Sequence, residues 1–96
     1  VNNMKENLND YRASIDKIDE EIQELFIKRM EIASKIAEYK HTNNISITNN
    51  NREEEIFNKI INNKNKIISN YYLDVQKCII KKSKEYQKSL IDTLKK

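Results

Sequence analysis

The sequence predicts an all-α protein of three helices, one of them very long. Glycine and proline are both absent, so signals for tight turns and hairpins are few. Apolar residues recur at alternating steps of four and three through the first forty positions, which is the repeat of a helical seam. Two asparagine-rich segments then interrupt the pattern and divide the chain into three parts.

The first helix is predicted over residues 4–42 by that seam. Its members are Met4, Leu8, Tyr11, Ile15, Ile18, Ile22, Leu25, Arg29, Ile32, Ile36 and Tyr39. At 1.5 Å per residue such a helix is roughly 55 Å long. A compact domain of this size has a radius of gyration of about 13 Å, so the rest of the chain is too small to cover the helix. We therefore expect the long helix to pair with a second copy of itself in a helical homodimer, and the alternative is an elongated monomeric hairpin.

Two shorter helices are predicted after the first break, which spans residues 42–51. Asn50 and Glu53 have the spacing of a capping box, and a helix is expected over 51–64. A polar connection follows, and Ser69 or Asn70 is expected to cap a third helix over 70–93. Residues 1–96 are thus expected to form a single domain.

Composition argues against several classes of function. The net charge is only +3, and the densest basic cluster, residues 81–84, has one aromatic neighbour, so no nucleic acid partner is expected. No run of 18 apolar residues exists, so no membrane association is expected. The lone Cys78 fits a reducing cytoplasm, and the single His41 leaves no cluster of metal ligands. Composition therefore gives no sign of a metal site.

Arginine is rare in this chain and its positions are informative. Of the eighteen cationic residues, only Arg12, Arg29 and Arg52 are arginines. Arginine grips a planar carboxylate through two parallel hydrogen bonds, which lysine cannot do. Arg29 occupies a seam position, where an unpaired guanidinium would be costly, so an anionic ligand is one interpretation. A register-setting polar residue, or an Arg whose head escapes to water, is the other.

Helical geometry relates the other cations to Arg29. Lys40 follows eleven residues later, about 20° round the helix and about 16 Å along it, so the two share a face. Arg12 lies about 100° away and some 25 Å back, so it cannot join that face from the same helix. In an antiparallel dimer, the partner's Arg12 could reach the same pocket.

Two further polar sets complete the candidates. Ser83 and Gln87 are four residues apart and project together from the third predicted helix. Arg52 and Glu53 open the second, where an acidic side chain also suits the helix dipole. Each set alone is equally compatible with ordinary surface or cap chemistry.

The ordered combination resembles the AroQ-class chorismate mutases. It consists of Arg12, the segment IDKIDEEI, Arg29 and Lys40, then N-x-x-R-E at 49–53 and S-x-x-x-Q at 83–87. The resemblance covers about residues 8 to 90. It implies an intertwined all-α homodimer whose two sites each use both subunits. It also implies the rearrangement of chorismate to prephenate in phenylalanine and tyrosine biosynthesis. That pericyclic reaction needs no nucleophile, metal or cofactor.

The resemblance also implies a role for each candidate residue. Arg29 and the partner's Arg12 would grip the two carboxylates of the substrate, with help from Ser83. Lys40 and Gln87 would donate hydrogen bonds to the ether oxygen, and Glu53 would accept one from the ring hydroxyl. The rest would support or wall the site: Arg52, Asn49, Ile36, Ile56 and Ile80.

The chain departs from the family pattern at two positions. Asn49 stands where an acidic residue is frequent. Asn can still accept a hydrogen bond, so activity is expected to persist with weaker substrate binding. Ser46 replaces a common loop proline. Two alternatives remain open at this level: an isochorismate pyruvate lyase on the same scaffold, and a non-catalytic helical dimerisation or regulatory module.

Overall fold

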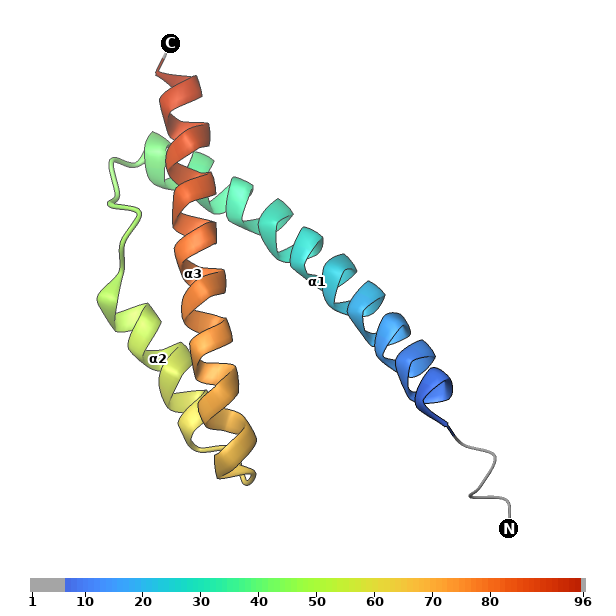
Figure 1. Cartoon of the computed structure of the whole chain (residues 1–96). Helices are drawn as coiled ribbons and strands as arrows, with labels where there is room; N and C mark the ends of the chain where they lie inside the picture. The colour runs from blue at the N-terminus through green and yellow to red at the C-terminus, as the bar shows by residue number, and fades with distance from the viewer. Residues whose placement is uncertain (1–6, 96) are drawn as a thin grey trace. The chain divides into compact units, whose positions relative to one another are not determined.

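The computed structural model describes residues 7–95, which form three α-helices and no strand. Helix α1 spans Leu8–Thr42, α2 spans Asn50–Ile61 and α3 spans Lys66–Leu94 (Figure 1). The predicted all-α class and the predicted number of helices are confirmed. The chain divides inside α1 into two units, Val1–Glu31 and Ile32–Lys96.

In the N-terminal unit, α1 begins at a reciprocal cap. The Asn7 Oδ1 accepts hydrogen bonds from the backbone N–H groups of Asn9 (2.9 Å) and Asp10 (3.1 Å), and the Asp10 carboxylate accepts one from the Asn7 N–H (3.2 Å). This is a capping box with Asn and Asp in place of Ser and Glu. The helix therefore begins at Leu8 rather than at the predicted residue 4, while Met4 itself lies outside the described residues.

The heptad seam of this unit is largely uncovered in the single chain. Leu8, Ile15, Ile22 and Leu25 each leave about half or more of their surface exposed, up to 64% for Leu25. Burying apolar surface contributes about 25 cal/mol per Å², so a row of exposed Ile and Leu side chains is unfavourable in water. The seam thus has the character of a face that packs against another helix.

The C-terminal unit contains the last turns of α1 together with α2 and α3. Helix α2 packs against α3. The buried apolar side chains among the described residues are few and small or branched: Ala33, Ala37, Ile80 and Ile91. Helix α2 contributes half-buried residues, and the Lys77 ammonium lies 5.9 Å from the ring centre of Phe57. This cation–π contact adds to the α2–α3 packing.

Polar side chains make up most of the buried face of α3. Ser69, Gln76, Ser83 and Gln87 are each less than a tenth exposed. They recur at helical spacing along the same stripe as Ile80. Buried polar groups need hydrogen-bond partners, and the Tyr72 hydroxyl donates to the Gln76 Oε1 at 3.0 Å. A core built this way is unusual for a structural helix.

Asparagine takes the place of glycine where α1 ends. Asn44 has a positive φ of 56°, the left-handed conformation that Asn tolerates better than most residues. The Ile45 N–H donates to the Lys40 carbonyl at 2.8 Å, and the Asn44 N–H donates to the His41 carbonyl at 3.4 Å. This is the pairing of a Schellman motif, and it ends α1 at the predicted Thr42 without glycine.

The caps of α2 and α3 differ from those predicted. Helix α2 is capped by Asn49, not Asn50, and it ends at Ile61 rather than at residue 64. Helix α3 begins at Lys66, because the Asn65 side chain accepts from the Ile68 N–H at 3.2 Å. The predicted cap at Ser69 or Asn70 is therefore wrong. Several consecutive asparagines offered equivalent caps, and local sequence could not choose among them.

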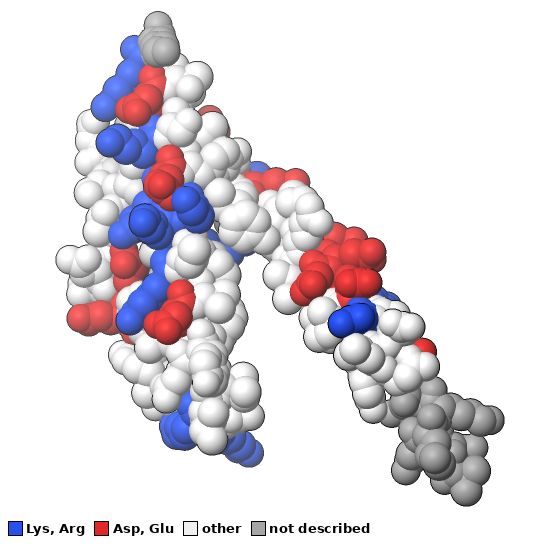
Figure 2. Space-filling view, in the orientation of Figure 1, with Lys and Arg blue, Asp and Glu red and all other residues white. Residues whose placement is uncertain are grey.

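Charges of both signs lie close together on the visible face of α3 (Figure 2). Figure 2 shows Lys and Arg side chains interleaved with Asp and Glu along α3 on the visible face. Within the described residues, no helix is both long and apolar enough to cross a lipid bilayer.

Candidate active site

Ser83 and Gln87 form a buried polar pair on α3. The Gln87 Nε2 donates to the Ser83 Oγ at 3.0 Å, and the side chains are only 7% and 5% exposed. The predicted projection of both residues from one face is observed. The Gln87 Oε1 is buried and has no hydrogen-bond partner among the described residues. An unpaired buried amide oxygen costs about 1–3 kcal/mol, so it marks a place where a ligand group would be favoured.

Lys40 is half-buried near the end of α1. Its Nζ donates to the carbonyl of Ile47 at 2.8 Å, across the connection between α1 and α2. An ammonium group has three donors, so this bond fixes the side chain and leaves two donors for another acceptor. The carbonyl of Ile47 thus holds Lys40 in place.

The start of α2 combines capping with charge. The Asn49 Oδ1 accepts from the Arg52 N–H at 3.1 Å, so this predicted site residue acts here as the N-cap. The Arg52 guanidinium pairs with Glu55 at 3.1 Å, but both side chains are more than half exposed. Such a pair contributes little to stability. It also means that the Arg52 head lies in a solvated position in this chain.

Glu53 pairs across helices with a residue that the sequence did not single out. The Lys84 Nζ lies 3.1 Å from the Glu53 Oε2, and the two side chains are 33% and 22% exposed. In the sequence, Lys84 is distinguished only as a member of the basic cluster at residues 81–84. The contact joins residues 31 positions apart, so only the packing of α2 on α3 reveals it.

The predicted apolar walls differ in burial. Ile80 is buried, Ile56 is half-buried, and Ile36 is 43% exposed. All three belong to the C-terminal unit.

The predicted site residues are divided between the two units. Nine of the eleven lie within Ile32–Lys96. The other two, Arg12 and Arg29, lie on α1 in Val1–Glu31, where Arg12 is exposed and Arg29 is half-buried. Among the described residues, the hydrogen bonds between members of the eleven that use a side chain are the Ser83–Gln87 pair and the Asn49 cap on Arg52. The Glu53 backbone N–H also donates to the Asn49 carbonyl at 3.1 Å.

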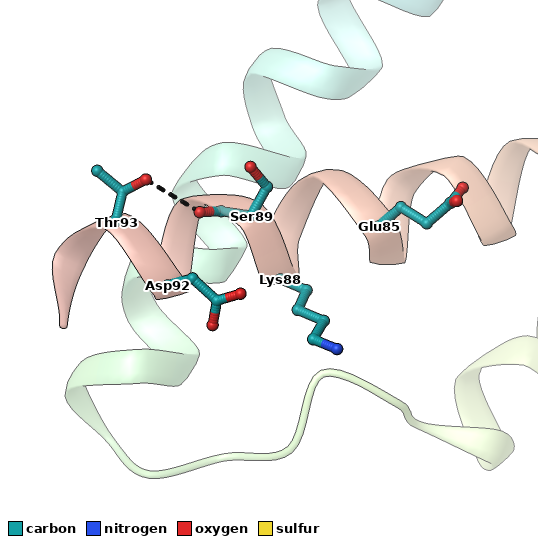
Figure 3. Close-up of a pocket in the computed structure, with 5 residues that line it drawn as sticks. All are labelled: Glu85, Lys88, Ser89, Asp92 and Thr93. Carbon is teal, nitrogen blue, oxygen red and sulfur yellow. Dashed lines mark hydrogen bonds between the residues drawn. The ribbon is translucent and has the colours of Figure 1, made fainter. Parts of the chain in front are cut away.

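A separate surface hollow contains none of the predicted residues. Figure 3 shows its lining, which comes entirely from one stretch of α3: Glu85, Lys88, Ser89, Asp92 and Thr93. The Thr93 hydroxyl donates to the backbone carbonyl of Ser89 at 3.1 Å, which is an ordinary bond within a helix. The hollow is open and its charges are mixed, so it lacks the features of a binding site. No group of three His, Cys, Asp or Glu side chains within residues 7–95 could hold a metal ion.

Comparison with known proteins places this arrangement in a family. The family model for chorismate mutase type II matches residues 11–88. The bifunctional chorismate mutase/prephenate dehydratase of Aquifex aeolicus (strain VF5) is 45% identical over 56 residues, which cover 58% of this chain and 16% of that protein.

A second relative matches over a longer stretch. The bifunctional chorismate mutase/prephenate dehydratase of Buchnera aphidicola subsp. Schizaphis graminum (strain Sg) is 34% identical over 90 residues, covering 92% of this chain and 23% of that protein. The chain thus spans less than a quarter of the length of these relatives, and no solved structure matches it. The match over residues 11–88 nonetheless covers most of the sequence, and the chain belongs to the type II chorismate mutase family.

Proposed function

We propose that this protein catalyses the rearrangement of chorismate to prephenate. One observation carries the proposal: the family match over residues 11–88 includes all eleven predicted site residues, from Arg12 to Gln87. The same family connection favours a place in phenylalanine and tyrosine biosynthesis, and the free Cys78 supports a reducing, cytoplasmic location.

The reaction makes two demands on a protein. One C–O bond of the ether breaks while a new C–C bond forms, so the flexible dianion must be held in a compact conformation. The ether oxygen also gains negative charge as its bond breaks, and fixed hydrogen-bond donors stabilise that charge best where water is excluded. Neither demand requires a side chain to react covalently.

In this proposal, arginines hold the substrate's carboxylates. Arg29 grips one carboxylate, and the partner's Arg12 grips the other. Arg52 supports this network, although its present partner is Glu55. Asn49 and Glu53, at the start of α2, face the ring hydroxyl, and Glu53 accepts its hydrogen bond.

Lys40 and Gln87 supply the donors for the ether oxygen. Each already has one partner that fixes it: the Ile47 carbonyl for Lys40, and the Ser83 hydroxyl for Gln87. Each also keeps at least one N–H group free of those bonds. Burial of Gln87 beside Ile80 supports the dry environment that this chemistry needs.

The proposal includes a homodimer in which the whole chain, residues 1–96, forms one domain with its partner. Its support is the uncovered apolar surface on both units. The seam of α1 is exposed, and so are Ile68, Tyr72 and Val75, which share a second face of α3. Pairing of two chains would bury these surfaces and would bring the partner's Arg12 to the site.

The proposal is tested by following the loss of chorismate with purified protein and identifying the product. We expect prephenate, and we expect Arg29→Ala to lower kcat/KM by at least about 100-fold while helicity is retained. Lys28→Ala, an exposed neighbour on the same turn, is the matched control and should keep full activity.

Two results would contradict the proposal. Full turnover in Arg29→Ala would remove the assigned role of the guanidinium. Pyruvate release from isochorismate, without prephenate formation from chorismate, would assign the scaffold to a lyase instead.

A further inference from the structure

The Glu53–Lys84 pair differs from the other ion pairs at the surface of the C-terminal unit. Arg52–Glu55 and Lys82–Glu85 each join residues three apart on one helix, and their side chains are more than half exposed. Glu53–Lys84 instead links α2 to α3, and both side chains are at least two-thirds buried. A partly buried pair is screened less by water and salt than an exposed one, and its geometry is better defined.

The pair uses only one oxygen of the Glu53 carboxylate. Lys84 contacts Oε2, and within residues 7–95 this carboxylate accepts no other side-chain hydrogen bond. A carboxylate has two oxygens with about four lone-pair positions, so Oε1 remains able to accept a hydrogen bond. In the Glu53 carboxylate, Oε2 is therefore bonded to Lys84, and Oε1 can accept a hydrogen bond from another group.

The location of Lys84 connects this pair with the proposed site. Lys84 directly follows Ser83, which bonds to Gln87 on the buried face of α3. Since neighbouring helical residues are 100° apart, Lys84 projects toward α2 while Ser83 stays on the buried stripe. The same turn of α3 thus serves both the polar pair and Glu53.

We infer that Lys84 is a positioning residue for Glu53. It holds Oε2, restricts the rotamers of the Glu53 side chain, and leaves Oε1 to accept from the ring hydroxyl of the substrate. The inference rests on the proposed function, in which Glu53 has that acceptor role. A long, flexible acidic side chain loses conformational entropy when it orders, and Lys84 removes part of that cost before the substrate binds.

The experiment compares two lysines of α3. Lys84→Met keeps a long apolar stem and removes the charge, whereas Lys84→Arg keeps a cation that can still reach Glu53. Lys82→Met is the matched control. Lys82 is also a lysine of α3 paired with a glutamate, but its partner is Glu85 on the same helix rather than Glu53, and its side chain is exposed. Each variant is assayed with chorismate and with an analogue that lacks the ring hydroxyl.

We expect Lys84→Met to lower kcat/KM for chorismate by about 5- to 30-fold, and to change it less than about twofold for the analogue. Lys84→Arg should recover most of the loss, and Lys82→Met should match the wild type. In a Glu53→Gln background, Lys84→Met should have little further effect, because the two substitutions remove one interaction.

The outcomes separate this inference from the proposed function. If the wild type does not convert chorismate, both fail. If the wild type is active and Lys84→Met is equally active, only the role of Lys84 is overturned. An equal loss on both substrates, together with a lower Tm, would make Lys84 a structural residue and would also overturn the inference.

Discussion

At the level of single residues, Gln87 is a buried polar side chain that is held by one hydrogen bond and can still form others. It is 7% exposed, its nitrogen is bonded to Ser83, and its oxygen is unpartnered within the described residues. An amide neither gains nor loses a proton in the accessible pH range, so its donor capacity does not depend on pH. A carboxyl group at the same position would donate only in its protonated form.

Gln87→Glu is therefore expected to make activity depend on pH. Burial disfavours the charged carboxylate and raises the pKa of the introduced group above the ordinary value for Glu of about 4.3. Activity should be highest at acidic pH and should fall as the pH rises through that raised pKa. The measurement is kcat/KM as a function of pH for both proteins.

The wild type is the reference, and it should show no such fall over the same range. Gln87→Ala should be poorly active at every pH, since it has no donor at all. A pH-independent profile for Gln87→Glu would show that this side chain does not donate to the reacting oxygen.

Asparagine residues determine the helix boundaries at the level of elements. Asn7, Asn49 and Asn65 cap the three helix starts, and Asn44 adopts the positive φ that ends α1. A chain without glycine or proline depends on side-chain oxygens for these ends. The boundaries are thus encoded by a residue type that also occurs at many positions with no such role.

Substitution of two asparagines distinguishes the true cap of α3 from the one that local sequence favoured. Asn65→Ala should lower the free energy of unfolding by about 1 kcal/mol, because the Ile68 N–H loses its acceptor. Asn70→Ala, inside the helix and exposed, should be neutral or slightly stabilising, because alanine has the higher helix propensity.

Chemical denaturation followed by circular dichroism would measure both values, with protein concentration held constant. If Asn70→Ala lowered the free energy of unfolding more than Asn65→Ala, the N-cap of α3 would be Asn70, one of the two residues that the sequence predicted.

Apolar surface is the main feature at the level of the whole molecule. The α1 seam and the second face of α3 remain exposed, while few apolar side chains are fully buried. A chain of 96 residues buries only a limited fraction of its surface by folding alone. Burial of these exposed apolar surfaces against a second chain would add stability, which supports the proposed homodimer. In the proposed dimer, each site would take Arg29 from one chain and Arg12 from the other.

Mixing two inactive variants tests that arrangement. Arg12→Ala and Arg29→Ala should each be inactive as homodimers. After mixing, unfolding and refolding at equal amounts, about half of the dimers are mixed, and each mixed dimer has one complete site, so about a quarter of wild-type activity should return.

Activity of the refolded mixture is compared with that of each variant refolded alone, and sedimentation measures the mass of the particle. A monomeric mass, or no recovery in a mixture that forms dimers, would contradict sites shared between two chains.

Much of the fold could be predicted because it follows from local physics. The heptad spacing and the absence of glycine and proline determine that the chain is helical, and α1 ends at Thr42 as predicted. The four-residue spacing of Ser83 and Gln87 determined that they share a face, which their hydrogen bond confirms. The family, too, could be inferred from the ordered polar residues, and the match over residues 11–88 confirms it.

The tertiary structure decided what depends on contacts between distant residues. The choice of Asn65 over Ser69 or Asn70 as a cap required backbone geometry, because each of the three side chains is of a type that can accept an N-cap hydrogen bond. The contact between Lys84 and Glu53 required α2 to pack on α3, and no spacing within one helix encodes it. Sequence by itself determined the helices, the stripe that carries the polar residues and the family. Packing decided which lysine meets which glutamate, because hydrogen bonds and ion pairs act over a few ångströms and pair residues that only the fold brings together.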